Sequence, residues 1–163
     1  MDRLKKSEEQ SKELVQMVNE YSSLLYRTAY IYCKNRMDAE EIVQETYLKY
    51  LKKKPHFESK QHEKAWLLRV TINLCKDYLR CFWNRCTERY EDHAAYEMDQ
   101  SWMLLDMIQR LPEKYRLVIQ LYYIEGYEIA EIADIIKKTE SAVRTRLSRA
   151  KNMLKDMEVR EHG

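Results

Sequence analysis

Glycine and proline are scarce in this sequence, with two of each among 163 residues. Alternating runs of β-branched residues are absent, so the composition favours an all-α protein. There is too little glycine for a phosphate-binding glycine loop, and no catalytic pattern recurs, so we expect neither an enzyme nor a cofactor. No apolar run approaches the roughly 20 residues that span a bilayer, and residues 1–14 lack the apolar core of a signal peptide. We therefore expect a soluble cytoplasmic protein without membrane insertion.

Cysteine is also used sparingly, at positions 33, 75, 81 and 86, and no two cysteines form a C-x-x-C pair. This spacing does not match a known zinc-binding motif. Reduced thiols and no bound metal are therefore expected, as is usual in the cytosol. A zinc site that includes His93 stays open as an alternative.

The most organised stretch runs from residue 111 to residue 155 and reads as three short helices. Pro112 suits the first helical turn, and Gly126 suits a left-handed helix end. The second helix carries Ile129, Ile132, Ala133 and Ile136 on one face. A third helix follows Lys137 and Lys138, with Thr139 as its expected N-cap.

The third of these helices has two distinct faces. One face carries the apolar residues Val143, Leu147, Ala150 and Leu154. Residues 137–155 also hold seven basic residues and only one acid, Glu140. A short helix, a turn and a basic helix are typical of a helix-turn-helix that enters the DNA major groove. The candidate DNA-binding residues are Ser141, Ala142, Arg144, Thr145, Arg146, Ser148, Arg149 and Lys151. A three-helix bundle with a solvated cationic face is the alternative.

Two amphipathic helices are predicted near the N-terminus, over residues 12–34 and 39–53. Residues 1–12 are expected to fray. Asp38 should cap the second helix, with Glu41 completing a capping box. Apolar side chains on one side and polar side chains on the other predict an antiparallel helical hairpin with one exposed polar ridge.

A long helix is predicted over residues 63–82, after a loop at residues 55–61 that contains Phe57. Its apolar positions cover most of its circumference, except for one polar stripe: Arg69, Asn73, Lys76 and Arg80. Three cations around one amide suit a phosphate backbone with one base contact. A stripe that only keeps the helix soluble explains these residues equally well. Likewise, Phe57 could be a hydrophobic plug or a base-stacking platform.

Three segments, in order, resemble the sigma-70 family of bacterial transcription initiation factors, and in particular its small extracytoplasmic-function (ECF) type. Residues 38–51 resemble the region 2 helix that docks on RNA polymerase, and residues 64–80 resemble the part that melts and reads the −10 element. Residues 111–154 resemble region 4, which reads the −35 element. The resemblance implies a region 2 domain at 1–83, an acidic linker at 84–100 and a region 4 domain at 101–163.

The resemblance implies a role for particular residues. The residues expected to contact the −10 element are Phe57, Glu58, Ser59, Lys60, Arg69, Asn73, Lys76 and Arg80. The residues expected to dock on RNA polymerase are Asp38, Glu41, Gln44, Glu45 and Tyr47. The implied partners are the β′ clamp helices and β flap of core RNA polymerase, promoter DNA and an anti-sigma factor.

Two departures from the family pattern concern the helix-turn-helix. Lys137-Lys138 stands where the turn usually has glycine and an apolar residue, and Glu128 stands where the short helix usually begins with serine or threonine. Two other functions remain open. One is a helix-turn-helix regulator that binds DNA without polymerase, and the other is a sigma-like protein that only binds an anti-sigma factor or polymerase.

Overall fold

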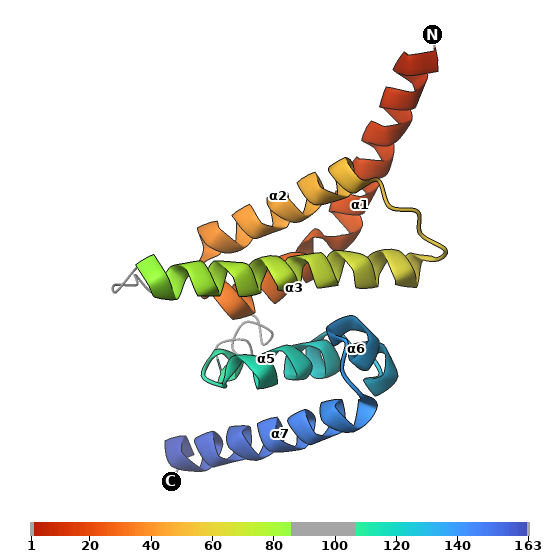
Figure 1. The fold of residues 1–163 in the computed structure, drawn as a ribbon. Coiled ribbons are helices and arrows are strands. Elements are labelled where there is room, and N and C mark those ends of the chain that lie inside the picture. The colour runs from red at the N-terminus through yellow and green to blue at the C-terminus, as the bar shows by residue number, and fades with distance from the viewer. Residues whose placement is uncertain (1, 86–106, 163) are drawn as a thin grey trace.

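The structure is a computed structural model that describes residues 2–85 and 107–162. All regular structure in these two ranges is helical, as expected. Three helices, α1 (Asp2–Cys33), α2 (Arg36–Lys53) and α3 (Lys60–Arg85), form an N-terminal domain. The C-terminal domain contains α5 (Glu113–Ile119), a π-helix (Gln120–Ile124), α6 (Ile129–Ile136) and α7 (Glu140–His162) (Figure 1).

Helix α1 begins earlier than predicted, at Asp2 rather than near residue 12. The second half of α1 packs as predicted, because Tyr21, Leu25, Thr28 and Tyr32 are all buried. The first half is exposed and projects from the domain (Figure 1). Its lysine, glutamate and glutamine residues have high helix propensity, so the helix propagates outward from its packed half.

Helix α2 is capped by a different residue from the one predicted. Asn35, not Asp38, is the N-cap, and its side chain accepts a hydrogen bond from the Asp38 backbone N–H at 3.1 Å. Asparagine and aspartate cap helices about equally well. Asn35 lies three residues before Asp38, so Arg36 and Met37 are helical.

Helix α3 begins at Lys60, three residues before the predicted start. The hydroxyl of Ser59 accepts a hydrogen bond from the His62 backbone N–H at 3.1 Å, which satisfies one donor of the first turn. Leu67, Leu68 and Cys75 are fully buried against α1 and α2. The Thr46 and Thr71 hydroxyls lie 3.0 Å apart and tie α2 to α3 inside this core.

The C-terminal domain follows the predicted three-helix order with two changes in its helix ends. The first helix begins at Glu113, with Pro112 at its N-cap, and it widens into the π-helix before Gly126. Gly126 has φ +76°, as predicted for a left-handed helix end. Helix α7 continues beyond the predicted stretch at 111–155 and ends at His162. The predicted linker at 84–100 lies largely outside the described residues, as does the start of the predicted region 4 domain.

Three helices are followed by a lysine in the left-handed conformation. Lys34, Lys54 and Lys137 have φ of 54°, 44° and 55°, and they follow α1, α2 and α6. Glycine usually occupies such positions because it has no Cβ. Lysine bears the strain instead, and it also places a cation near the negative end of each helix dipole.

The two domains pack against each other through α1 and α3 on one side and α5 and α6 on the other (Figure 1). Arg116 of α5 is 8% exposed and donates a hydrogen bond of 2.7 Å to the carbonyl oxygen of Ile31, near the end of α1. Gln120 is fully buried and donates to the hydroxyl of Thr28 at 3.0 Å. Polar contacts therefore lie at the centre of this interface.

No helix in the described ranges is long and apolar enough to cross a membrane. Within the same ranges, no group of three or more histidine, cysteine or acidic side chains is arranged to hold a metal. Cys33 and Cys75 are buried free thiols, and Cys81 is an exposed one. Cys86 and His93 lie outside the described residues, so the alternative zinc site is not addressed by the structure.

Candidate nucleic-acid interface

The basic face of α7 is accessible over most of its length. Val143 and Ala150 are fully buried against the rest of the domain, which turns the opposite side of the helix outward. Six of the predicted DNA-binding residues are exposed: Ser141, Arg144, Thr145, Ser148, Arg149 and Lys151. Among the described residues, Arg144 pairs with Glu140 of its own helix, at 3.4 Å, and this ion pair is exposed. A phosphate could displace this pair at little cost, because exposed pairs contribute little.

The turn before α7 is well formed despite its unusual sequence. The backbone N–H of Lys138 donates to the Ala133 carbonyl at 3.0 Å, which closes the end of α6. Thr139 caps α7 as predicted, since its hydroxyl accepts from the Ala142 backbone N–H at 3.1 Å. At the start of α6, Glu131 accepts from the Glu128 backbone N–H at 3.4 Å. The helix-turn-helix geometry is therefore kept, although Lys137-Lys138 and Glu128 depart from the family's usual residues at these positions.

The remaining α7 candidates lie on the flanks of this face. Ala142 and Arg146 are half-buried. Arg149 contacts the hydroxyl of Tyr115 and thereby lowers the pKa of that phenol. The Lys151 ammonium group lies 5.3 Å from the centre of the Tyr123 ring. Arg149 and Lys151 thus also hold α7 against the segment that begins with α5.

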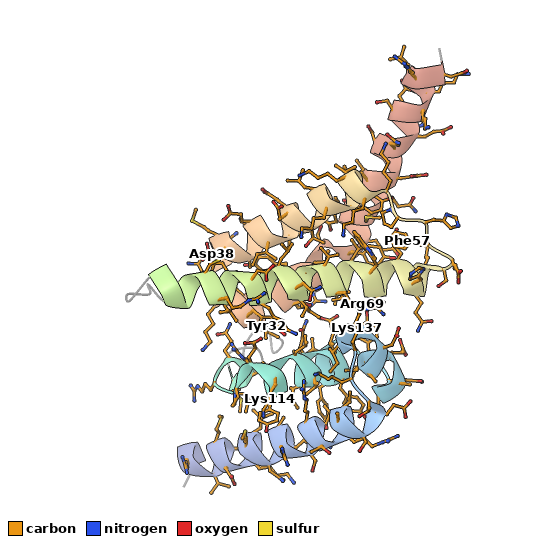
Figure 2. The ribbon with its side chains drawn as sticks, in the orientation of Figure 1. Tyr32, Asp38, Phe57, Arg69, Lys114 and Lys137 are labelled. Atoms are coloured by element: carbon orange, nitrogen blue, oxygen red, sulfur yellow. The ribbon has the colours of Figure 1, made fainter. Side chains whose placement is uncertain are left out.

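The polar stripe of α3 is accessible at three of its four positions. Asn73, Lys76 and Arg80 are exposed, and Arg80 pairs with Asp77 one turn away. Arg69 differs, because its guanidinium group donates to both the backbone carbonyl of Asp134 at 3.2 Å and its carboxylate at 3.1 Å. Asp134 belongs to α6, so the C-terminal domain occupies the start of the stripe, as the positions of Arg69 and Lys137 indicate (Figure 2).

The loop before α3 holds Phe57 in an aromatic cluster. Its ring lies 6.2 Å from that of Tyr50, 5.4 Å from that of His62 and 5.8 Å from that of Trp66, centre to centre. This packing is what the plug alternative predicts, and the Phe57 side chain is half-buried. Glu58, Ser59 and Lys60 are exposed beside it. The structure therefore brings the four loop candidates together at one end of α3.

The outer ridge of α2 carries the predicted polar residues and also apolar ones that the sequence analysis missed. Glu41, Gln44 and Glu45 are exposed. Met37, Leu48 and Leu51 are 74%, 50% and 39% exposed, and they continue the same ridge at helical spacing. The signal was present in the sequence, since α2 has more apolar positions than one packed face can bury. We call Met37, Glu41, Gln44, Glu45, Leu48 and Leu51 the α2 ridge.

Two other predicted docking residues point toward the core. Tyr47 is 9% exposed, and its hydroxyl lies 2.7 Å from that of Ser22. Burial raises the pKa of Tyr47, which keeps the phenol protonated. Asp38 accepts a hydrogen bond from the hydroxyl of Tyr78 on α3. These two residues join α2 to its neighbours, and the accessible ridge lies beside them.

Family comparisons match both domains. Residues 17–85 match the model for sigma-70 region 2, and residues 101–154 match the model for sigma-70 region 4. The chain belongs to the sigma-70 family. Its relatives place it in the ECF type. The chain is 27% identical over 160 residues to the sigma factor SigV of Bacillus subtilis, and the alignment covers 93% of this chain and 95% of SigV. It is 25% identical over 162 residues to the ECF sigma factor SigW of the same organism, covering 85% of each.

Solved sigma factors share the fold. The sigma factor RpoE of Bartonella quintana, determined in complex with the anti-sigma factor NepR, aligns with a TM-score of 0.73 and 24% identity over 89% of this chain and 96% of that one. CnrH in complex with the cytosolic domain of CnrY aligns with a TM-score of 0.67 and 21% identity over 90% and 88%. The all-α fold predicted from the sequence is confirmed. This sigma factor is a transcription initiation factor that binds RNA polymerase and promoters.

Proposed function

We propose that this sigma factor directs core RNA polymerase to promoters through three separate surfaces. The α2 ridge docks on the β′ clamp helices, the α7 face reads the −35 element, and the α3 stripe with its loop holds the −10 element. The C-terminal domain also contacts the β flap. The domain boundaries at 1–83 and 101–163 form part of the same proposal, and all chemistry belongs to the polymerase.

The α2 ridge is the observation that best supports this function over a stand-alone DNA-binding regulator. Three large apolar side chains are exposed along it between polar ones. Large exposed apolar groups on one surface are typical of protein–protein contact. A regulator that binds only DNA has no use for such a ridge, whereas a factor that must bind polymerase does.

Transcription in vitro tests the proposal. Purified bacterial core polymerase is given a DNA library with random upstream sequence, with and without the protein. We expect protein-dependent transcripts that share an upstream motif. DNA binding without any protein-dependent initiation would favour the stand-alone regulator. Polymerase binding without initiation would favour the sigma-like protein that only binds an anti-sigma factor or polymerase.

A substitution in the α2 ridge tests polymerase docking separately. Leu48→Glu places a charge at the centre of the ridge, and we expect polymerase affinity to fall by about 2 kcal/mol or more, as for a hot-spot residue. Val15→Glu is the matched control, because Val15 is 59% exposed on α1, outside the ridge. Equal affinities of the two variants, measured by titration with core polymerase, would remove the ridge from the docking surface.

A further inference from the structure

The projecting half of α1 is a surface that no other described element covers. Every residue from 2 to 13 is exposed, and this half of the helix extends away from α2 and α3 (Figure 1). The match to sigma-70 region 2 begins only at residue 17, so the projecting half lies outside it. Leu4 and Val15 are large apolar residues that are 71% and 59% exposed. These features call for a partner that the region 2 match does not supply.

Five residues of this half lie on one side of the helix. At about 100° per residue, the rotation of an α-helix, these five positions fall within about 100° of one another. Met17, the first buried residue of α1, lies on roughly the opposite side. The five residues therefore face solvent while the second half of α1 is packed in its domain. We call Leu4, Glu8, Ser11, Lys12 and Val15 the α1 strip.

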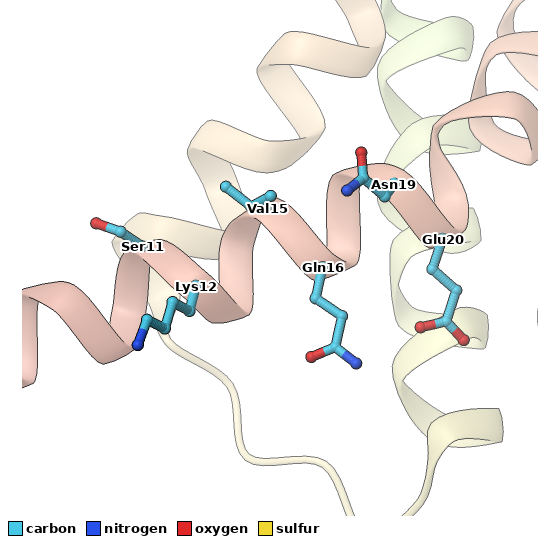
Figure 3. Close-up of a pocket in the computed structure, with 6 residues that line it drawn as sticks. All are labelled: Ser11, Lys12, Val15, Gln16, Asn19 and Glu20. Atoms are coloured by element: carbon cyan, nitrogen blue, oxygen red, sulfur yellow. The ribbon is translucent and has the colours of Figure 1, made fainter.

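An open groove runs along α1 beside Val15. It has a volume of about 640 Å³, and Figure 3 shows that its lining residues all come from α1: Ser11, Lys12, Val15, Gln16, Asn19 and Glu20. All six are exposed. A spacing of four residues makes two neighbouring ridges on the helix, residues 11, 15 and 19 and residues 12, 16 and 20, with the groove between them. Helices pack by placing a ridge of one into such a groove of the other.

The charge of the projecting half does not suit a polyanionic partner. Residues 2–13 carry four basic and four acidic residues. DNA and anionic membrane surfaces attract segments with an excess of basic residues. Exposed apolar residues among charges of both signs are instead typical of helices that pair with other helices.

The α1 strip is complementary to itself in the antiparallel direction. When Leu4 lies opposite the partner's Val15, two-fold symmetry also places Val15 opposite the partner's Leu4. Glu8 then lies beside the partner's Lys12, and Lys12 lies beside the partner's Glu8. Each leucine side chain reaches the groove beside the valine of the other copy. Apolar contacts and opposite charges are therefore satisfied twice in one arrangement.

We propose that the α1 strip is a self-association surface, on which a second copy of this chain docks its own α1 in the antiparallel direction. Each copy contributes about three turns of one helix. Such a contact is smaller than the roughly 1,200 Å² that stable complexes bury, so the dimer is weak and forms at high concentration. The α2 ridge and the α7 face lie on other helices, and the inference does not depend on the proposed function.

Sedimentation equilibrium tests the surface. The average mass should rise above the 19.9 kDa of one chain as the concentration is raised to about 500 µM. Leu4→Glu and Val15→Glu should each weaken self-association about tenfold, because each variant places a charge at two apolar contacts. Val159→Glu is the matched control, since Val159 is 70% exposed on α7, and its self-association should equal that of the wild type.

Two outcomes of this experiment would overturn the proposal. One is a wild-type protein that keeps the mass of one chain at every concentration. The other is self-association that Leu4→Glu weakens no more than Val159→Glu does. If the wild type is monomeric and Leu4→Glu lowers the affinity for core polymerase, the α1 strip is part of the polymerase contact instead.

A charge swap tests the direction of the pairing. Glu8→Lys and Lys12→Glu each oppose like charges at both contacts, so each variant alone should associate several-fold more weakly than the wild type. An equimolar mixture of the two restores both opposite-charge pairs and should associate as tightly as the wild type. Sedimentation of fluorescently labelled Glu8→Lys with unlabelled Lys12→Glu measures this, and circular dichroism confirms that both variants are helical. A mixture no tighter than its components would overturn the antiparallel pairing.

Discussion

The two candidate DNA-binding surfaces differ in how the rest of the chain treats them. The α7 face is turned outward, and the ion-pair partner of Arg144, Glu140, lies on the same helix. The α3 stripe has the same chemistry, but its first member, Arg69, is held by α6 of the other domain. The helical spacing of the basic residues is equally clear in the sequence of both helices. The difference between them shows that a helix face is set by local residues, whereas its availability is set by distant ones.

The largest effect is expected at the open surface. Arg144→Ala should weaken promoter duplex binding by about 1–3 kcal/mol if Arg144 contacts a base, or weaken binding to all sequences uniformly if it contacts a phosphate. Titrations with base-substituted −35 elements separate these outcomes. Arg160→Ala, on the exposed end of α7, is the control.

A smaller effect is expected at the covered surface. Asp134→Asn weakens the partner of Arg69 and should strengthen single-stranded DNA binding by up to about 1 kcal/mol, the range of an exposed ion pair. Fluorescence anisotropy with a random single-stranded DNA probe measures the change. Glu158→Gln also neutralises an exposed acid of the C-terminal domain, but it lies far along α7. If both variants gain equally, net charge rather than release of Arg69 explains the gain.

The smallest effect concerns the turn that aligns the open surface. Lys137→Gly removes a side chain from a residue with φ 55° and should stabilise the C-terminal domain by about 0.5 kcal/mol. The gain is small because glycine also loosens the unfolded chain and the helix dipole loses a cation. Chemical denaturation measures it. Lys54→Gly, at φ 44° in the N-terminal domain, gives the matched comparison. A loss of stability at position 137 would show that the lysine side chain contributes more than the strain costs.

Much of each surface could be predicted from the sequence, because helical periodicity is local. The buried positions Val143, Leu147 and Ala150 fix which side of α7 faces outward. The cap at Thr139 and the left-handed Gly126 also follow from local chemistry. The family resemblance, carried by three segments in order, led to the correct family.

Other features depend on contacts that periodicity does not contain. The Arg69–Asp134 pair joins residues 65 positions apart in the chain, so neither residue indicates the other. The exposure of Leu48 depends on which apolar positions of α2 the neighbouring helices cover. Asn35 rather than Asp38 is the N-cap because the chain turns at Lys34, which has a left-handed conformation. A glycine at position 34 would have indicated this turn in the sequence, whereas a lysine does not.

The hydrogen bond from Arg116 to Ile31 has a consequence for how the chain folds. The last carbonyl groups of a helix have no partner within it, and here one near the end of α1 is satisfied by a buried arginine of the other domain. The last turn of α1 therefore belongs to two cooperative units at once, its own bundle and the docked C-terminal domain. Docking of the C-terminal domain therefore stabilises the end of α1, and the stability of the N-terminal domain includes a contribution from its neighbour.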